Sequence, residues 1–444
     1  MIALLVLLAA PITLEEVRAA SRQNLDALRA EIEARRQQLG VNVARSAILP
    51  QVGLTSGIQG LYAGPQVVQN FVPVRDNSGE VVAFAQPIGD LPFATSRNTY
   101  SLNLTVTQLI VDGGRWWNQL ALSGHQARAA EGQLEEQRLV AELEAVNRFY
   151  QLLNAQFSLS VLENAVKGSE TQLDRADSLF EAARAAKLDA LTAAVNLGND
   201  RIAVLRQRQA VINAQVELLK WLGQPTREIE AIDPGSLTPD VPQRPAPKVE
   251  AALTVARRHR PLLKVLDEQV AAAERQVDVA WAQFFPTLNL QAGYQRQAPV
   301  GVTFFTDPNR NHAVWGGLNL SWQLFNGFGH HAQVQQARES LSQTRLQRER
   351  AEIDLTGDLR RAIEQLETQL QIAQIATDNL RLTEASLKLA EERFSAGAGS
   401  TLEVRDAQVK LVNAQLSRLQ ARVDVEVARA ALKRVVGADV EEVR

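Results

Sequence analysis

The chain has 444 residues, 47 of them basic and 50 acidic, so its formal net charge is −3. This balance, with lysine and arginine scattered rather than clustered, argues against a nucleic-acid partner. The absence of cysteine excludes disulfide bonds, thiolate metal sites and cysteine nucleophiles, and is compatible with an oxidising compartment.

The chain begins with a short apolar segment, residues 2–10, followed by Pro11. A membrane helix needs roughly 20 apolar residues, so this run is too short to span a bilayer. We expect residues 1–10 to be a secretory signal peptide or its remnant; the alternative is a buried terminal segment. No Lys or Arg precedes the run, which departs from the usual signal pattern and leaves open a start upstream of Met1.

The remainder of the sequence is one unit written twice. Residues 180–223 align without a gap on residues 394–437, an offset of 394 − 180 = 214. Identical residues recur in this block, among them Leu188 and Leu402, Asn199 and Asn413, and Arg208 and Arg422. The same offset carries Asp112-Gly113 onto Asn326-Gly327. An internal structural repeat is therefore expected, with repeat one at 11–223, repeat two at 248–437, a proline-rich linker at 224–247 and a tail at 438–444.

Each repeat is predicted to open with one helix of about 35 residues, because a proline stops the apolar pattern at its end. These helices cover residues 13–49, before Pro50, and residues 248–285, before Pro286. Thr13-Leu-Glu-Glu16 has the spacing of a capping box, which marks the start of the first one.

A β-hairpin is predicted next, within residues 50–112 and again within residues 286–326. In residues 100–107 Leu102, Leu104 and Val106 alternate with uncharged polar residues, and residues 286–295 alternate in the same way. A period of two is typical of a strand with one apolar and one polar face. The connections at 64–97 and 299–311 are long, and the first contains the turn signal Asp76-Asn-Ser-Gly79.

Two helices complete each repeat: a long one at 113–182 and at 327–395, and a shorter one at 187–222 and at 400–436. A helix of roughly 70 residues is about 105 Å long, which equals two of the shorter helices end to end. We therefore expect each long helix to lie beside a stacked pair. Apolar residues at intervals of four and three predict close lateral packing, among them Leu139, Leu143, Val146, Leu359, Ile363 and Leu366.

The strands have features of membrane strands, although a soluble sheet packed on helices would alternate in the same way. The polar face is nearly uncharged, as in a water-filled lumen. Five of the six tryptophans lie within or beside the strands, as in an aromatic membrane belt: Trp116, Trp117, Trp281, Trp315 and Trp322. Four strands cannot close a barrel and open edges are not tolerated in lipid, so a membrane interpretation requires copies to assemble.

With these features the chain resembles the TolC-like outer-membrane efflux channel family, the outer membrane factors. The resemblance rests on the strand-to-helix turns 108–115 and 323–327, on Pro50 and Pro286, and on the hairpin tip 393–406. It implies an α+β membrane protein in which a long antiparallel α-helical barrel continues into a transmembrane β-barrel, with four strands per chain and twelve in a homotrimer. It also implies the outer membrane of a Gram-negative bacterium, with a large periplasmic part.

The function implied by the resemblance is that of a passive exit duct in a tripartite efflux or type I secretion system. Its partners would be a periplasmic adaptor protein, a proton-driven or ATP-driven inner-membrane pump and outer-membrane lipid. The rival hypothesis is a soluble helical scaffold or coiled-coil adaptor, whose strands form a small capped sheet.

The resemblance also places the periplasmic aperture and the adaptor contact at the tips of the helical hairpins. Glu403 and Asp406 stand where the family has an acidic pair at the aperture, and Asp189 repeats the first of these acids in repeat one. The adaptor would contact the second tip through Arg393, Gly397 and Ser400. At the first tip Ala183 stands in place of the glycine and would be the adaptor-contacting residue there. Ser400-x-x-Glu403 is also a capping box, so Glu403 has the alternative role of a helix cap.

We expect no enzymatic activity and no cofactor, because the sequence has no nucleophile motif and no phosphate-binding glycine loop. The one histidine cluster is His330-His331. Adjacent helical residues point to different faces, so a solvated helix start is favoured over a metal pair.

Overall fold

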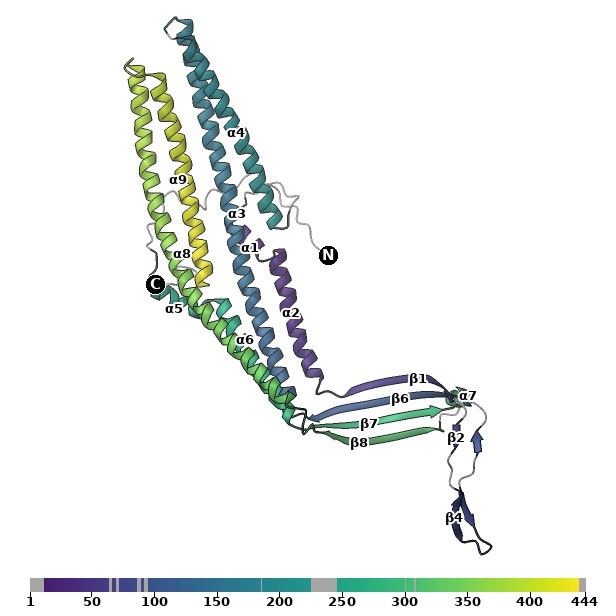
Figure 1. The fold of residues 1–444 in the computed structure, drawn as a ribbon. Coiled ribbons are helices and arrows are strands. Elements are labelled where there is room, and N and C mark those ends of the chain that lie inside the picture. Colours follow the sequence, from purple (N-terminus) through teal and green to yellow (C-terminus); the bar gives the residue numbers. More distant parts are fainter. Residues whose placement is uncertain are drawn as a thin grey trace. The chain divides into compact units, whose positions relative to one another are not determined.

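The computed structural model describes residues 12–63, 66–68, 72–85, 89–91, 95–184, 186–224, 246–299, 301–306 and 309–438. The expected signal segment 1–10 lies outside the described residues, as do most of the linker 224–247 and of the tail 438–444. The described chain combines long helices with a sheet of four antiparallel strands, which confirms the expected fold class (Figure 1). Two compact units divide it: one draws on residues 1–39, 124–272 and 341–444, the other on 40–123 and 273–340.

The first helix of each repeat is broken in two, so the single helix of about 35 residues predicted from the apolar pattern is wrong. In repeat one α1 spans Leu14–Ser21 and α2 spans Leu25–Ser46. In repeat two α5 spans Val249–His259 and α6 spans Pro261–Trp281, with a 3₁₀ turn at Ala282–Phe284. Thr13 caps α1 as expected, because its hydroxyl accepts from the Glu16 N–H at 3.2 Å.

Both breaks have a local cause in the sequence. The break between α1 and α2 ends at Asn24, because its Oδ1 accepts from the Asp26 N–H at 2.8 Å and so caps the start of α2. At the second, Arg260 is extended, with ψ 116°, as a residue before proline tends to be. Pro261 then starts α6 at the position where a missing N–H costs nothing.

The four-stranded sheet has the order β1-β6-β7-β8. Its strands are β1 Gln51–Ala63, β6 Thr95–Val111, β7 Thr287–Ala298 and β8 His312–Ser321. Leu54 pairs with Leu104, Leu104 with Tyr294, and Leu290 with Leu318, so apolar side chains share one face. The other face carries Ser, Thr, Asn and Gln. Among the described strands, β1 and β8 each pair on one side only.

The long connection between β1 and β6 contains two further ladders. Strand β2 Gln66–Val68 pairs with β5 Gly89–Leu91, and β3 Val72–Arg75 pairs with β4 Val81–Ala85. The turn expected at Asp76 is present, with its carboxylate accepting from the Ser78 and Glu80 N–H groups. The connection between β7 and β8 contains a short helix, α7 Gly301–Thr306.

The turns from strand to long helix have the same geometry in both repeats. Gly113 and Gly327 both have φ +67°. A Cβ on Gly113 would lie 2.5 Å from the Phe285 Cβ, so only glycine fits there. The residue before this glycine caps the long helix in each repeat. Asp112 Oδ2 accepts from the Trp116 N–H at 2.7 Å, and Asn326 Oδ1 accepts from the His330 N–H.

Two helical hairpins follow these turns (Figure 1). In repeat one, α3 Arg115–Glu181 leads to α4 Lys187–Trp221, and in repeat two α8 Gly329–Ser395 leads to α9 Thr401–Val436. One core of the helical unit is centred on Phe149, Tyr150 and Leu153, and another on Leu359 and Leu432. Among the described residues, none of the helices combines the length and apolar character that crossing a bilayer requires.

The expected stacking of shorter helices is visible where they meet. Asn24 Nδ2 donates to the carbonyl oxygen of Trp221 at 2.8 Å, so one buried amide caps the end of α4 and the start of α2. In repeat two the Arg260 guanidinium donates to the carbonyl oxygens of Arg434 and Val435, both at 2.9 Å, at the end of α9. Asn24 and Arg260 occupy equivalent positions, because 260 − 24 = 236 is also the offset between the helix-ending prolines, 286 − 50.

Candidate functional site

The tip of the first hairpin is a tight turn that contains an alanine in a left-handed conformation. The N–H of Ala183 donates to the Phe180 carbonyl and that of Arg184 to the Leu179 carbonyl, the pattern of a Schellman C-cap. This motif requires a positive φ, and Ala183 has φ +53°. Asp189 begins α4 by accepting from the Ala186 N–H at 3.3 Å, so its carboxylate has a capping role in this structure.

The second tip repeats this geometry with a glycine. The N–H of Gly397 donates to the Phe394 carbonyl and that of Ala398 to the Arg393 carbonyl, and Gly397 has φ +74°. The Ser400 hydroxyl accepts from the Glu403 N–H at 3.2 Å and caps α9. The two tips are thus structural equivalents, and they differ in the residue that takes the left-handed conformation.

The acids of the second tip are exposed on α9. Glu403 lies 3.9 Å from the Arg393 guanidinium, which also donates to the Ala398 carbonyl at 3.3 Å. Asp406 pairs with Lys410 at 2.6 Å. Glu403 and Asp406 are three positions apart, so they share one exposed helix face. The capping hydroxyl belongs to Ser400, which leaves the Glu403 carboxylate exposed to solvent.

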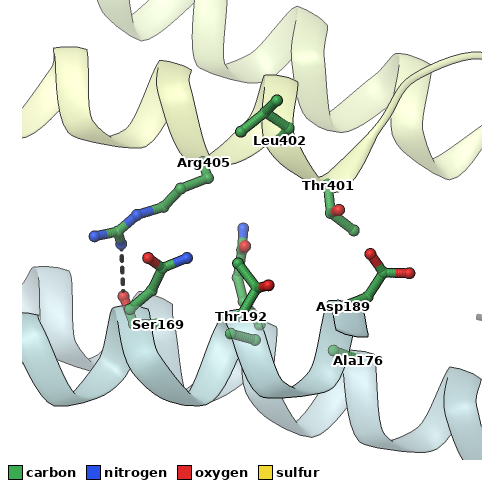
Figure 2. A pocket seen from close by; sticks show the side chains of 10 residues that line it. Ser169, Ala176, Asp189, Thr192, Thr401, Leu402 and Arg405 are labelled. Carbon is green, nitrogen blue, oxygen red and sulfur yellow. Dashed lines mark hydrogen bonds between the residues drawn. The ribbon is translucent and has the colours of Figure 1, made fainter. Parts of the chain in front are cut away.

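A half-buried ion pair, which we call the clamp, joins the two hairpins near their tips. Arg405 on α9 donates to both carboxylate oxygens of Asp200 on α4, at 2.8 and 2.9 Å. It also donates to the Ser169 hydroxyl on α3 at 3.0 Å, the contact drawn in Figure 2, and this hydroxyl in turn donates to Asp200. The Ser169 side chain is 3% exposed, so the clamp ties the second hairpin to the interior of the first.

The electrostatics of the clamp favour the ionised carboxylate. Burial raises the pKa of Asp200, but the hydrogen bonds from Arg405 and Ser169 outweigh burial and lower the pKa below its ordinary value. Sequence reasoning missed all three clamp residues, because their spacing along the helices resembles that of ordinary solvated charges.

Next to the clamp lies a small cavity between the hairpins, with a volume of about 150 Å³. Figure 2 shows Asp189 and Thr192 of α4 facing Thr401 of α9 across it. Its other polar lining residues are Ser169 and Arg405 of the clamp and the amides Gln172 and Asn196. Among the described residues no group of three His, Cys, Asp or Glu side chains is arranged to hold a metal ion.

Two of the tryptophans expected at a membrane interface have packing partners. Trp116 is buried, and its Nε1 donates to the Ala44 carbonyl at 2.9 Å. Trp315 lies on the polar face of the sheet and covers Gly293, where a Cβ would come 2.7 Å from the indole ring. These contacts give Trp116 and Trp315 roles in packing.

The other three tryptophans, like Trp315, are exposed, and they lie near the end of the sheet at which the long helices begin. The ring of Trp117 meets that of Trp116 at 4.2 Å, and Trp281 lies 5.2 Å from the ring of Phe284. Trp322 donates from Nε1 to the Phe284 carbonyl at 3.0 Å. A place in the membrane interface stays a prediction for all five tryptophans.

Of the histidine pair at the start of α8, His331 is exposed, as expected, whereas His330 is partly buried. The His330 ring lies 2.9 Å from the amide oxygen of Gln283, and it meets the Phe284 ring edge-on at 5.6 Å. These contacts explain His330 as a packing residue at the turn from strand to helix.

Comparison with known proteins agrees with this architecture. The family model "Outer membrane efflux protein" matches residues 16–224 and 252–438. The chain is 26% identical over 361 residues to the outer membrane efflux protein BepC of Brucella suis, covering 79% of this chain and 74% of that protein. It is 23% identical over 407 residues to the outer membrane protein TolC of Salmonella enteritidis, covering 89% and 76%.

Solved structures share the fold. The CmeC outer membrane channel of Campylobacter jejuni matches with a TM-score of 0.75 at 14% identity, covering 100% of this chain and 93% of that one. The open state of the MtrE outer membrane channel of Neisseria gonorrhoeae matches with a TM-score of 0.75 at 15% identity, covering 96% and 89%. CmeC and MtrE are both outer membrane channels. The chain therefore belongs to the outer membrane efflux protein family, and it is an outer-membrane exit channel with a large periplasmic helical part.

Proposed function

We propose that three copies of the chain form one continuous duct, closed at its periplasmic end by the hairpin tips. The observation that supports assembly is the open sheet: β1 and β8 are both edges, and four strands are too few to close a barrel. Unpaired strand edges are not tolerated in lipid. Three copies supply twelve strands, because 3 × 4 = 12, with β1 of each copy pairing with β8 of the next.

The helices support the same assembly, because α4 and α8 leave apolar stripes uncovered in the single chain. The stripe on α4 repeats at intervals of three, four and seven residues and consists of Leu188, Leu191, Val195, Ile202, Leu205, Ile212 and Val216. The stripe on α8 includes Ile353, Ile372, Ile375, Leu382 and Leu389. Stripes with this spacing pack side by side in coiled coils. In the duct, the stripe on α4 faces the stripe on α8 of the neighbouring copy.

The duct is a passive conduit gated at its tips. Glu403 and Asp406 share an exposed face of α9 and form an acidic ring in the trimer, with Asp189 contributing from the first tip. The clamp holds the two hairpins together and so keeps the aperture narrow. Opening requires the second hairpin to move away from the first, which separates Arg405 from Asp200.

The duct works with a periplasmic adaptor and an inner-membrane pump driven by protons or ATP. The adaptor docks on the second tip through Arg393, Gly397 and Ser400. The first tip, with Ala183 in the equivalent position, is a different surface, so the two tips have different contacts. A relative named for pyoverdine export, OpmQ of Pseudomonas aeruginosa, supports a role in export.

Conductance in planar bilayers tests the gate. The double variant Glu403→Ala with Asp406→Ala is expected to raise single-channel conductance and to weaken block by multivalent cations, because the acidic ring is removed. Ser400→Ala is the matched control, since it removes the cap of α9 and leaves both acids in place. Equal effects of both variants would show that Glu403 acts as part of the helix start and would overturn the gate.

Fractionation separates the duct from the soluble scaffold. The chain is expected in the outer-membrane fraction, migrating as a trimer that heat converts to monomer. A monomer that stays soluble without detergent would contradict the proposal.

A further inference from the structure

The end of the sheet farthest from the long helices carries a cluster of cationic and aromatic side chains. We define this outer cluster by Arg296 of β7, His312 of β8, Phe304 of α7, Tyr100 of β6 and Tyr294 of β7. The Arg296 guanidinium lies 5.2 Å from the centre of the Phe304 ring. The Phe304 ring lies 6.1 Å from that of Tyr100, and the Tyr294 and His312 rings stack at 6.0 Å and 17°.

The strand register places the outer cluster on the apolar face of the sheet. Arg296 pairs with Leu102 on one side and with His312 on the other, and side chains directly opposite each other lie on the same face. Tyr294 and Leu290 lie an even number of residues before Arg296 on the same strand, so their side chains are on the same face as Arg296. In the proposed duct this face is turned toward lipid, so a cation occupies the lipid side of the barrel.

The charge of Arg296 indicates how deep in the membrane the outer cluster lies. A charge on the lipid face is strongly unfavourable at the middle of the bilayer and nearly neutral at its surface. The long helices are periplasmic and join the opposite ends of the strands, so the outer cluster lies at the outer leaflet. The aromatic composition agrees with this position, because tyrosine and phenylalanine rings with polar neighbours are typical of membrane interfaces.

The short helix α7 has features of a helix that lies at a membrane interface. Phe304 packs onto the sheet and is 8% exposed, whereas the next residue, Phe305, is 77% exposed. One ring therefore holds α7 on the apolar face, and the other projects outward at the level of the lipid headgroups.

We propose that the outer cluster binds a phosphate group of the phosphorylated glycolipid in the outer leaflet. Stacking on Phe304 holds the guanidinium of Arg296 in one plane, and a guanidinium offers a fork of donors that matches phosphate oxygens. His312 lies opposite on the same face, and Arg310, two residues before it in the sequence, is exposed. From Arg296 to His312 the sequence contains two arginines, one histidine and a single acid, Asp307, which lies outside the described residues.

This site rests on the membrane orientation of the proposed duct, and its test is made on the purified full-length protein. Native mass spectrometry in detergent measures binding of diphosphoryl lipid A and of the same lipid after removal of both phosphates. The wild type is expected to bind the phosphorylated lipid about tenfold more tightly, as two charge-assisted hydrogen bonds predict. The same spectra show whether the protein is a trimer. Failure to assemble would count against the proposed duct, whereas a trimer without a preference for the phosphorylated lipid would count against this site alone.

Four variants assign the preference to the cluster. Arg296→Gln is expected to abolish it, and Arg296→Lys to retain part of it, because lysine keeps the charge without the planar fork. His312→Gln is expected to weaken it, because it removes the imidazole that stands opposite Arg296 on the same face. Arg115→Gln, which removes an exposed cation at the opposite end of the sheet, is the matched control and is expected to change nothing.

Two results would overturn the site. One is equal binding of both lipids by the wild type, which would make the cluster an apolar anchor only. The other is a preference that persists unchanged in Arg296→Gln. If that variant does not assemble, His312→Gln decides, because the exposed His312 side chain is replaceable without loss of core packing.

Discussion

Arg405 and Asp200, 205 positions apart in the sequence, form two parallel hydrogen bonds between the second hairpin and the first. The pair is half-buried, with 22% of the Arg405 side chain and 19% of the Asp200 side chain exposed. A charge-assisted pair with this geometry contributes about 1.5 kcal/mol. In the proposed duct the pair holds the tips closed.

Breaking the clamp is expected to raise the open probability of the channel in planar bilayers. For Arg405→Ala the increase is expected to be about tenfold, the equivalent of the 1.5 kcal/mol lost. Arg201→Ala is the matched control, because it breaks the exposed ion pair with Glu170, which lies within the first hairpin. An equal rise in both variants would show that loss of charge, rather than separation of the hairpins, opens the channel.

The clamp also predicts how the gate responds to pH. The pKa of Asp200 is below its ordinary value, so the stabilisation is fully present above that ordinary value, about 4, and is lost as the pH falls through the lowered pKa. Conductance of the wild type is therefore expected to stay constant between pH 7 and about pH 4 and to rise below it. The variant Asp200→Asn is expected to be more open at neutral pH and to lack the acid step. An acid step that persists in Asp200→Asn would assign the titration to another group.

The two junctions between stacked helices are expected to contribute different amounts to the free energy of unfolding. Asn24→Ala removes one buried cap of two helices and is expected to lower the free energy of unfolding by about 1–2 kcal/mol. Arg260→Ala is expected to cost more, about 3 kcal/mol, because it removes the nearer cation from the buried Glu136 carboxylate, 3.2 Å away, and leaves only Arg434 at 3.7 Å. Arg258→Ala, at an exposed neighbouring position, is the control for loss of a positive charge. Denaturant unfolding measures all three, and an Arg260→Ala variant no less stable than Arg258→Ala would contradict this account.

The tip alanine predicts a stabilising substitution. An alanine in the left-handed conformation is strained by about 1 kcal/mol, which glycine relieves. Ala183→Gly is expected to protect the first tip from limited proteolysis, and Gly397→Ala to expose the second tip to it. The two substitutions exchange the residues of equivalent turns, so they control for each other. If Ala183→Gly increased cleavage, flexibility rather than strain would govern the tip.

Much of the fold was predictable because it is written twice. The shared offset of 214 located the turns, the hairpin tips and the last helix of each repeat, and the period of two identified β6 and β7. The helix breaks were not predicted, because the apolar spacing of the sequence continues across each of them. The local signals were nevertheless present, since Asn24 precedes a helical run and Pro261 disfavours helix at Arg260.

The clamp could not be predicted in the same way. Ser169, Asp200 and Arg405 lie on three helices, and each is an ordinary polar residue within its own helix. Only the packing of α9 against the first hairpin brings them together. The Trp315 ring is a similar case, because its contact with Gly293 depends on the cross-strand register rather than on its neighbours in sequence.

Cysteine cross-linking across the proposed interface tests the trimer most directly, because the natural chain has no cysteine. Leu191 of α4 and Leu389 of α8 lie near the tips on the two uncovered stripes, so Leu191→Cys with Leu389→Cys places one thiol on each side of the interface. In outer membranes a bis-maleimide is expected to produce dimers and trimers and no larger species, while either single variant stays monomeric. A ladder that continues beyond three chains, or monomers alone, would contradict the closed trimeric duct.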